Sequence, residues 1–192
     1  MPVTAIDRLT AEHRVIEQML ILLERLAGRL DRGGDLPARL LMDLVDLAEQ
    51  YVDVLHHTKE ERRLFEIVIE RGVQAEGGSV STLLHHHETG RSQLWDLRGE
   101  LQRLRQGDPN AAAGCAMVAR QYVELMRNHI RMEDENVFPM VSQAISVEED
   151  LALTRYFAEC DAARHAAGLL TRFQQLRGRC AELDEPGARE IA

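Results

Sequence analysis

The sequence predicts an all-α protein, and three observations support this class. Helix-favouring Leu, Ala, Glu and Arg are abundant, whereas aromatic residues make up 4% of the 192 residues and Pro occurs five times. Apolar residues recur every three or four positions through nearly the whole chain, as they do on one face of a helix. Gly and Pro gather at only a few points, where helices are expected to end.

Four interruptions divide this pattern into five predicted helices. The interruptions lie at 32–35, 72–78, 107–109 and, more weakly, 142–146, and the helices span about 5–31, 36–71, 80–106, 110–142 and 147–180. Because the connections are short, consecutive helices should be antiparallel neighbours. We predict an antiparallel up-down four-helix bundle over residues 1–145, an additional C-terminal helix packed on it over 146–183, and a frayed tail over 184–192.

Composition excludes several classes of partner. The formal net charge is -9, and basic residues form no run, which argues against nucleic acid or an anionic membrane as the main partner. No apolar run approaches the ~18 residues of a membrane span, and the first residues lack a signal-peptide pattern. Three cysteines without CxxC spacing should be reduced thiols that pack as small hydrophobes. We expect a soluble cytoplasmic protein that binds neither nucleic acid nor membrane.

Each of the first four predicted helices has one apolar line of residues, spaced by three and four, that contains a histidine. These histidines are His13, His56, His87 and His129. An α-helix rises ~1.5 Å per residue, and all four lie about 20 to 22 residues from the turns near 33 and 107. They should therefore meet in one layer. A single such histidine is usually a hydrogen-bonded core residue, but four in one layer indicate a shared role.

Two of these helices also place a glutamate, Glu60 or Glu133, on the same line four residues after the histidine. Burying an unpaired carboxylate is costly, and no Lys or Arg is expected on an inward line at this height to compensate for it. A cation should supply the balance. Four imidazoles and two carboxylates suit a pair of bridged divalent transition ions, with iron favoured over manganese or zinc.

Periodicity also separates these histidines from their neighbours in the sequence. His85 and His86 fall on polar lines of the third predicted helix, so both are expected to face solvent. His57 falls on a more polar line than His56. His57, His85 and His86 are therefore not expected to contribute to the layer.

Four further polar residues could support the layer from outside: Tyr51, Tyr122, Asp161 and His165. A phenol there could donate to a metal-bound oxygen or simply pack, and packing is the expected role. Asp161 reaches the height of the layer on the fifth predicted helix. A solvated surface is nevertheless expected for Asp161 and His165, because a fifth helix packs outside a four-helix core.

Residues 56–65 and 129–138 echo each other, since each segment begins with His and has Glu four and Phe nine residues later. Together with Glu12-His13 and residues 87–91, they resemble the hemerythrin-like, or HHE cation-binding, family. The resemblance covers most of residues 1–142. It implies a four-helix bundle around a non-heme di-iron centre with an oxo or hydroxo bridge. Carried across by position, it implies iron ligation by His13, His56, His87 and His129, with Glu60 and Glu133 as bridging carboxylates.

The sequence departs from the oxygen-carrying hemerythrins in two places. Those proteins take a fifth histidine from a His-x-x-x-His pair on the third helix, but Leu83 and Arg91 flank His87 at that spacing. They also use an Asp five residues after the last histidine. Asp134 stands there, but Glu133 is preferred because it lies on the inward line. Fewer imidazoles leave more positions open, and open positions suit reactivity more than reversible carriage.

The four-His, two-Glu set resembles the branch that includes iron–sulfur cluster repair proteins and bacterial proteins linked to nitric oxide, peroxide or iron handling. We therefore expect a centre that meets oxygen, nitric oxide or peroxide for sensing, scavenging or redox chemistry, including consumption of peroxide or nitric oxide by an enzyme. The alternatives are iron storage or other metal binding without turnover, and reversible oxygen binding.

Overall fold

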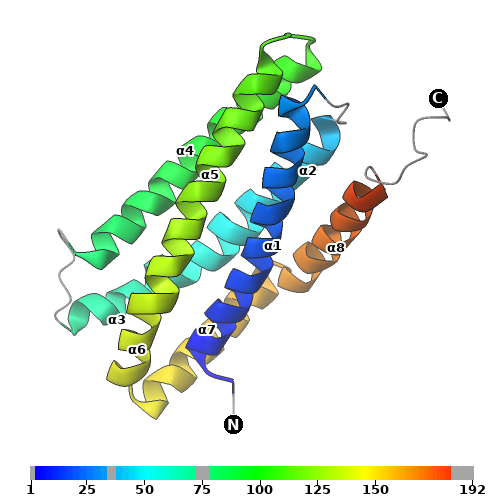
Figure 1. The fold of residues 1–192 in the computed structure, drawn as a ribbon. Helices are drawn as coiled ribbons and strands as arrows, with labels where there is room; N and C mark the ends of the chain where they lie inside the picture. The colour runs from blue at the N-terminus through cyan, green and yellow to red at the C-terminus, as the bar shows by residue number, and fades with distance from the viewer. Residues whose placement is uncertain (1–2, 34–37, 72–77, 183–192) are drawn as a thin grey trace.

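The computed structural model describes residues 3–33, 38–71 and 78–182, and its regular elements are all helical. The predicted all-α class is therefore confirmed. Figure 1 shows long helices lying side by side, with α1 (Ala5–Asp31) and α4 (Ser79–Arg105) running upward. The predicted tail 184–192 and most of the turn 72–78 lie outside the described residues.

Two of the four long helices of the bundle, called arms here, each consist of several consecutive helical segments. The second arm consists of α2 (Ala38–Ala48), η1 (Glu49–His57), η2 (Glu60–Leu64) and α3 (Phe65–Glu70). The fourth consists of α5 (Ala111–Met132), η3 (Glu133–Val137) and α6 (Phe138–Ala144). The η segments are π-helical, with hydrogen bonds that span five residues instead of four. Both arms run downward in Figure 1.

The predicted single helix 147–180 is wrong, because the structure breaks it into α7 (Val147–Ala163) and α8 (Ala166–Glu182). The chain turns at His165, whose φ of 53° lies in the left-handed region. Neither Gly nor Pro marks this break in the sequence, so periodicity alone could not locate it. α7 packs against α1, and α8 packs against α2 and η1.

Side-chain caps fix where α1 and α7 begin. At the start of α1, the Thr4 hydroxyl accepts a hydrogen bond from the Asp7 backbone N–H, and the Asp7 carboxylate accepts one from the Thr4 N–H. Ser146 and Glu149 form the same reciprocal pair before α7. Each capping box satisfies two backbone donors that the first helical turn would otherwise leave unpaired.

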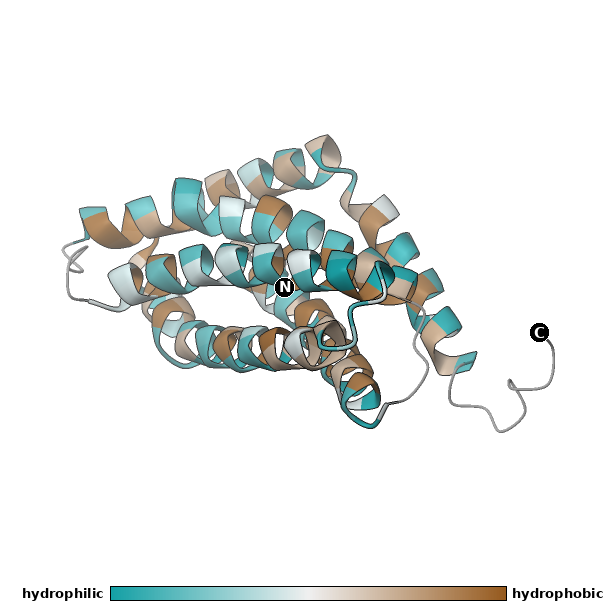
Figure 2. Ribbon diagram, turned by 90° about the horizontal axis from the view of Figure 1, so that it is seen from above, coloured by the Kyte–Doolittle hydropathy of each residue, from teal (hydrophilic) through white to brown (hydrophobic). Residues whose placement is uncertain are grey.

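The interior contains two apolar clusters with a polar layer between them. The larger cluster extends from Ile16 toward the end of α1 and includes the buried faces of α2, α4, α5 and α8. The smaller cluster includes Leu9, Phe65 and Phe138 and reaches Phe157 of α7. Figure 2 shows that hydrophobic and hydrophilic residues alternate along every helix, as expected where each helix buries one face. Within the described ranges, no helix is long and apolar enough to span a bilayer.

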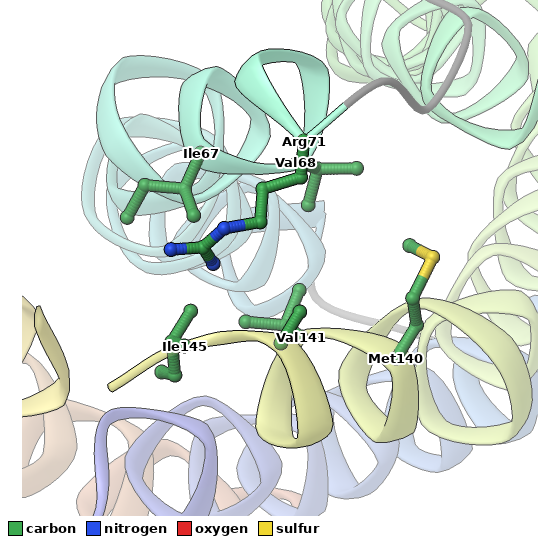
Figure 3. Close-up of a pocket in the computed structure, with 7 residues that line it drawn as sticks. Ile67, Val68, Arg71, Met140, Val141 and Ile145 are labelled. Carbon is green, nitrogen blue, oxygen red and sulfur yellow. The ribbon is translucent and has the colours of Figure 1, made fainter. Parts of the chain in front are cut away.

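A small apolar pocket lies between α3 and α6, and Figure 3 shows its lining residues, among them Ile67, Arg71 and Met140. Its volume is about 20 Å³, which is room for about one water molecule. This pocket is therefore too small for a ligand, and the polar layer is the better candidate for a functional site.

Candidate metal centre

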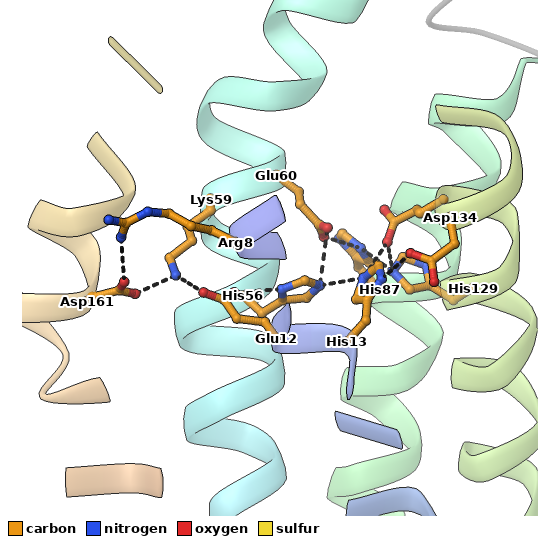
Figure 4. Close-up of polar contacts among 11 residues, drawn as sticks. Arg8, Glu12, His13, His56, Lys59, Glu60, His87, His129, Asp134 and Asp161 are labelled. Carbon is orange, nitrogen blue, oxygen red and sulfur yellow. Dashed lines mark hydrogen bonds and ion pairs between the residues drawn. The ribbon is translucent and has the colours of Figure 1, made fainter. Parts of the chain in front are cut away.

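Seven buried side chains form the polar layer, and each is at most 2% exposed: His13, His56, His57, Glu60, His87, His129 and Glu133. All six residues predicted as ligands are thus brought together, and Figure 4 shows imidazoles converging on the Glu60 carboxylate. Their donor atoms form two groups, with a spacing of at most 4.8 Å within each. The first group is His13, His56, Glu60 and Glu133, and the second group is His57, Glu60, His87 and His129.

The two glutamates link the groups. Glu60 Oε1 lies 3.2 Å from His56 Nε2, and Glu60 Oε2 lies 3.6 Å from His87 Nε2. Glu133 Oε2 lies 3.2 Å from the Nε2 atoms of both His13 and His129. Each carboxylate therefore faces one histidine of each group, which is the placement that a bridging carboxylate needs.

Paired imidazoles face each other within both groups. His13 Nε2 lies 3.0 Å from His56 Nε2, and His87 Nε2 lies 3.3 Å from His129 Nε2. Two nitrogens that bind one ion at about 2.1 Å lie about 3.0 Å apart when the angle at the ion is near 90°. The spacing of these donors therefore fits one ion in each group.

His57 is the site residue that sequence reasoning missed. The expectation that it lies on a polar line is wrong, because its ring is buried and stacks on His87 with 3.7 Å between ring centroids. The π-helical winding of η1, which ends at His57, fits an extra residue into the turn and brings both His56 and His57 inward. Periodic spacing assumes α-helical winding, so nothing in that pattern could have indicated the change.

The two neighbouring histidines of α4 differ from each other. His85 is exposed, as expected, but the expectation that His86 faces solvent is wrong. His86 is half-buried, and its ring centroid lies 5.9 Å from that of His129. A slightly wider buried face of α4 accounts for this position. His86 belongs to neither group.

Three of the imidazoles donate outward to a carboxylate. His13 Nδ1 lies 2.7 Å from Asp134, His56 Nδ1 lies 2.9 Å from Glu12, and His87 Nδ1 lies 2.7 Å from Glu61. Such a bond places the proton on Nδ1 and leaves the Nε2 lone pair pointing into the layer. Asp134, the alternative to Glu133, thus lies behind His13 rather than within a group.

A cation lies behind each of these outer carboxylates. Arg14 contacts Asp134, Arg91 contacts Glu61, and Lys59 contacts Glu12. The expectation that no Lys or Arg lies on an inward line at this height is wrong, because Lys59 is fully buried. Its long side chain passes outward to Glu12 and Asp161, so it supplies no compensating charge to Glu60 or Glu133.

The four residues considered as outer support have different positions. Asp161 is half-buried against Lys59 rather than on a solvated surface, because it supplies a counter-charge to that lysine. His165 is exposed at the break between α7 and α8. Tyr51 and Tyr122 are buried, and a Cβ at position 90 would lie 3.5 Å from the Tyr122 ring. Burial and the charges of Glu12 and Asp161 raise the pKa of Tyr51, so its phenol stays protonated.

The layer has a strong demand for positive charge. Burial opposes the charged imidazole, but the carboxylates of Glu60 and Glu12 outweigh it and raise the pKa of His56 to about 10. Burial together with the charges of His87 and His129 lowers the pKa of His57. His129 and His13 hold the pKa of Glu133 well below its usual range despite burial. The same carboxylates that favour protons on His56 would favour a metal cation.

The carboxylate oxygens of Glu60 and Glu133 give a further test of whether the layer fits a metal. Among the described residues, neither carboxylate oxygen of Glu60 or Glu133 accepts a hydrogen bond, although all four atoms are buried. Buried polar atoms without a partner are costly and are rare in native proteins. Carboxylate oxygens and imidazole nitrogens are good ligands for divalent transition metals, so the residues present fit such ions.

Residues 4–141 match the hemerythrin HHE cation binding domain. The chain belongs to this family. It is also 26% identical over 156 residues to an uncharacterized protein of Mycobacterium bovis (Mb2018) and to one of Mycobacterium tuberculosis (Rv1995). The match covers 80% of this chain and 60% of each relative, so the chain spans less than two thirds of their length. No solved structure matches.

Membership of the HHE family and the geometry of the layer agree. This is a hemerythrin-like helical domain whose clustered histidines and glutamates can bind metal cations. The segments α7 and α8 lie beyond the matched residues. Asp161 of α7 nevertheless contacts Lys59, which lies next to the layer.

Proposed function

We propose that this hemerythrin-like protein holds two iron ions, one in each group, and presents them to a small molecule. His13 and His56 would bind the first ion, and His57, His87 and His129 would bind the second. Glu60 and Glu133 would bridge the two. The observation that carries this proposal is the pair of buried carboxylates, which accept no hydrogen bond within the described ranges and face histidines of both groups.

The donor set favours iron over zinc. Zinc in structural sites prefers a single tetrahedral shell of four ligands, whereas seven donors with two shared carboxylates suit a pair of ions with higher coordination numbers. With both carboxylates as bridges, the first ion would have four protein donors and the second five, so ions with about six ligands would keep at least one position each for an exogenous molecule. Iron bound there would supply reversible binding of, or electron exchange with, oxygen, nitric oxide or peroxide.

The chain's own residues would protect such a centre from bulk water. Phe138 stacks on His13 with 5.1 Å between ring centroids, and Phe65 stacks on His87 at 5.9 Å. Both are the phenylalanines that end the echoed segments, and both are buried. They close the layer on the side of the smaller apolar cluster. A small uncharged molecule is therefore a better ligand for this centre than a large polar one.

Reversible oxygen binding is a second candidate, and His57 favours it. A centre with four imidazoles favours reactivity over carriage, but His57 adds a fifth imidazole to the second group. A group with three imidazoles leaves fewer open positions than a group with two. Sensing, scavenging and reversible carriage therefore all remain within the proposal, and the experiment below separates them.

The test is metal analysis followed by spectroscopy. We expect about two iron atoms per chain after purification from iron-sufficient cells, because six or more converging donors satisfy two ions. One metal per chain, or zinc, would contradict the proposal. Optical spectra of the reduced protein would then be recorded with oxygen, nitric oxide and peroxide. Colour that is lost again on removal of oxygen would favour carriage, and consumption of peroxide or nitric oxide would favour an enzyme or scavenger.

A further inference from the structure

Lys59 is the single lysine in the sequence, whereas the other 22 basic residues are arginines. It lies between η1 and η2, three residues from His56, and is fully buried. Lysine is almost never buried to this degree unless its ammonium is paired. The position of the single lysine therefore requires an explanation from its partners.

The Lys59 ammonium joins two carboxylates from different helices. Nζ donates to Asp161 Oδ1 of α7 at 2.5 Å and to Glu12 Oε1 of α1. The other oxygen of Glu12 accepts from His56 Nδ1 at 2.9 Å. Figure 4 shows this row of side chains leading from Asp161 through Lys59 and Glu12 to His56.

α7 surrounds the ammonium with more than one contact. The ring of Phe157, one turn before Asp161, lies 5.8 Å from Nζ, within the range of a cation–π interaction. The second oxygen of Asp161 lies 3.6 Å from the Arg8 guanidinium. The Asp161 carboxylate is thus held on both sides, and α7 fixes where the ammonium lies.

The corresponding cations behind the other histidines also contact a second carboxylate, Glu17 for Arg14 and Asp53 for Arg91, but they are far less buried. Arg14, behind His13, and Arg91, behind His87, have side chains that are 51% and 40% exposed, so water can replace much of what they do. Lys59 is 0% exposed, and water cannot replace its partners. Losing Asp161 would leave the ammonium half-paired in the interior and free to draw Glu12 away from His56.

We propose that Lys59 and Asp161 are positioning residues for His56, through which α7 sets the affinity of the first group for its metal. Glu12 holds the imidazole with Nε2 toward the layer, Lys59 holds Glu12, and Asp161 holds Lys59. Outer partners of this kind typically change metal affinity 10- to 100-fold. The inference rests on the proposed metal centre and goes beyond it, because α7 lies outside the residues that match the family.

The test is titration of the metal-free full-length protein with Co²⁺, with visible absorption as the readout. Wild type should bind two ions, and Asp161→Asn should weaken one of them about 10-fold. Asp150→Asn is the matched control, because Asp150 is another half-buried carboxylate of α7 that contacts α1, accepting from the Ala5 N–H at 2.9 Å. It has no link to Lys59 and should leave both affinities unchanged. Equal weakening by both variants would reduce Asp161 to a general support of α7 and overturn the proposal.

Three further measurements separate positioning from folding. In Lys59→Met, the added change Asp161→Asn should have no further effect on Co²⁺ affinity, since coupled residues are non-additive. Asp161→Glu should restore most of the affinity that Asp161→Asn loses. Lysine-selective ¹⁵N labelling gives a single side-chain signal, which should shift with Asp161→Asn but not with Asp150→Asn.

The outcomes distinguish failure of the positioning role from failure of the proposed metal centre. Two Co²⁺ ions in wild type with unchanged affinity in Asp161→Asn would overturn the positioning role alone. Fewer than two ions in wild type would overturn the proposed centre itself.

Discussion

The two groups contain the same number of donors but differ in how firmly their histidines are held. In the first group, both His13 and His56 donate from Nδ1 to a carboxylate within 2.9 Å. In the second group, only His87 does so. His57 Nδ1 lies 3.6 Å from Asp53, and His129 Nδ1 has no partner among the described residues. Outer hydrogen bonds fix ring orientation and raise ligand basicity, so we expect the first group to bind its metal more tightly.

The weaker outer support of the second group has a local cause in the winding of η1. His57 enters the layer because η1 winds more widely than an α-helix, and its ring then stacks on His87 instead of reaching a carboxylate. The second group gains a third imidazole in this way, at the cost of less rigid outer support. We therefore expect the second group to release its metal more readily than the first group.

The largest expected effect comes from Glu60, which belongs to both groups. Glu60→Ala should abolish stable binding of both ions, because each would lose its shared carboxylate. Glu61→Ala is the comparison, since Glu61 lies next in the chain but reaches the layer only through the outer nitrogen of His87, and it should weaken only one ion. Metal content per chain and equilibrium Fe²⁺ titration would measure both. Retention of one tight ion in Glu60→Ala would show that the carboxylate is not shared.

Replacing His57 should break the second group alone. His57→Ala removes one of three imidazoles there and should lower bound iron from about two atoms per chain toward one. His86→Ala, on α4 and close to His129, should leave iron content nearly unchanged because His86 belongs to neither group. Metal analysis of the two variants decides between these positions. Equal iron loss in both would show that His86 and not only His57 contributes to the centre.

Most of the layer could be predicted from sequence, because a spacing of three and four residues identifies the inward face wherever the chain is α-helical. The predicted bounds 5–31 coincide with α1, and His13 and His87 lie inward on unbroken helices as expected. Glu60 and Glu133 also lie inward, although both begin π-helical segments. His57 could not be predicted, because a change in winding leaves no mark in residue spacing.

Two other features depended on tertiary contacts that the sequence does not display. Lys59 is a polar residue on a helical line, and only the approach of Glu12 and Asp161 makes its burial favourable. The break at His165 contains neither Gly nor Pro. Packing of α8 against α2 and η1 offsets the strain of a positive φ there.

Chelation should expose the difference in affinity between the groups. A bound ion at 100 times its dissociation constant stabilises the folded state by about 2.7 kcal/mol, which corresponds to about 5–10 °C in Tm for a chain of this size. We therefore expect a weak chelator to remove one ion first and a stronger one to remove the second, with Tm falling in two steps. In His57→Ala the first step should be missing. A single concerted loss in wild type would mean that the groups do not differ.

The outer carboxylates should affect one group each. Asp134→Ala frees His13 and should weaken the first group about 10-fold, whereas Glu61→Ala frees His87 and should weaken the second group by a similar factor. Both effects should be far smaller than that of Glu133→Ala or Glu60→Ala. Competition titrations that resolve the two ions would measure them. A loss from Asp134→Ala as large as that from Glu133→Ala would show that the inner and outer carboxylates are exchanged.

The smallest expected effect tests whether stability and metal affinity can be separated in α7. Ser146 caps this helix through the Glu149 backbone N–H, four turns from Asp161. Ser146→Ala should lower the free energy of unfolding by about 1 kcal/mol, as loss of an N-cap usually does. Because the cap contacts neither Lys59 nor either group, both metal affinities should stay at their wild-type values. Denaturant unfolding and Co²⁺ titration of the same sample would measure the two quantities. Weaker binding in this variant would mean that any loosening of α7 reaches the first group, and the tighter affinity expected there would then depend on the whole helix rather than on the Asp161 carboxylate.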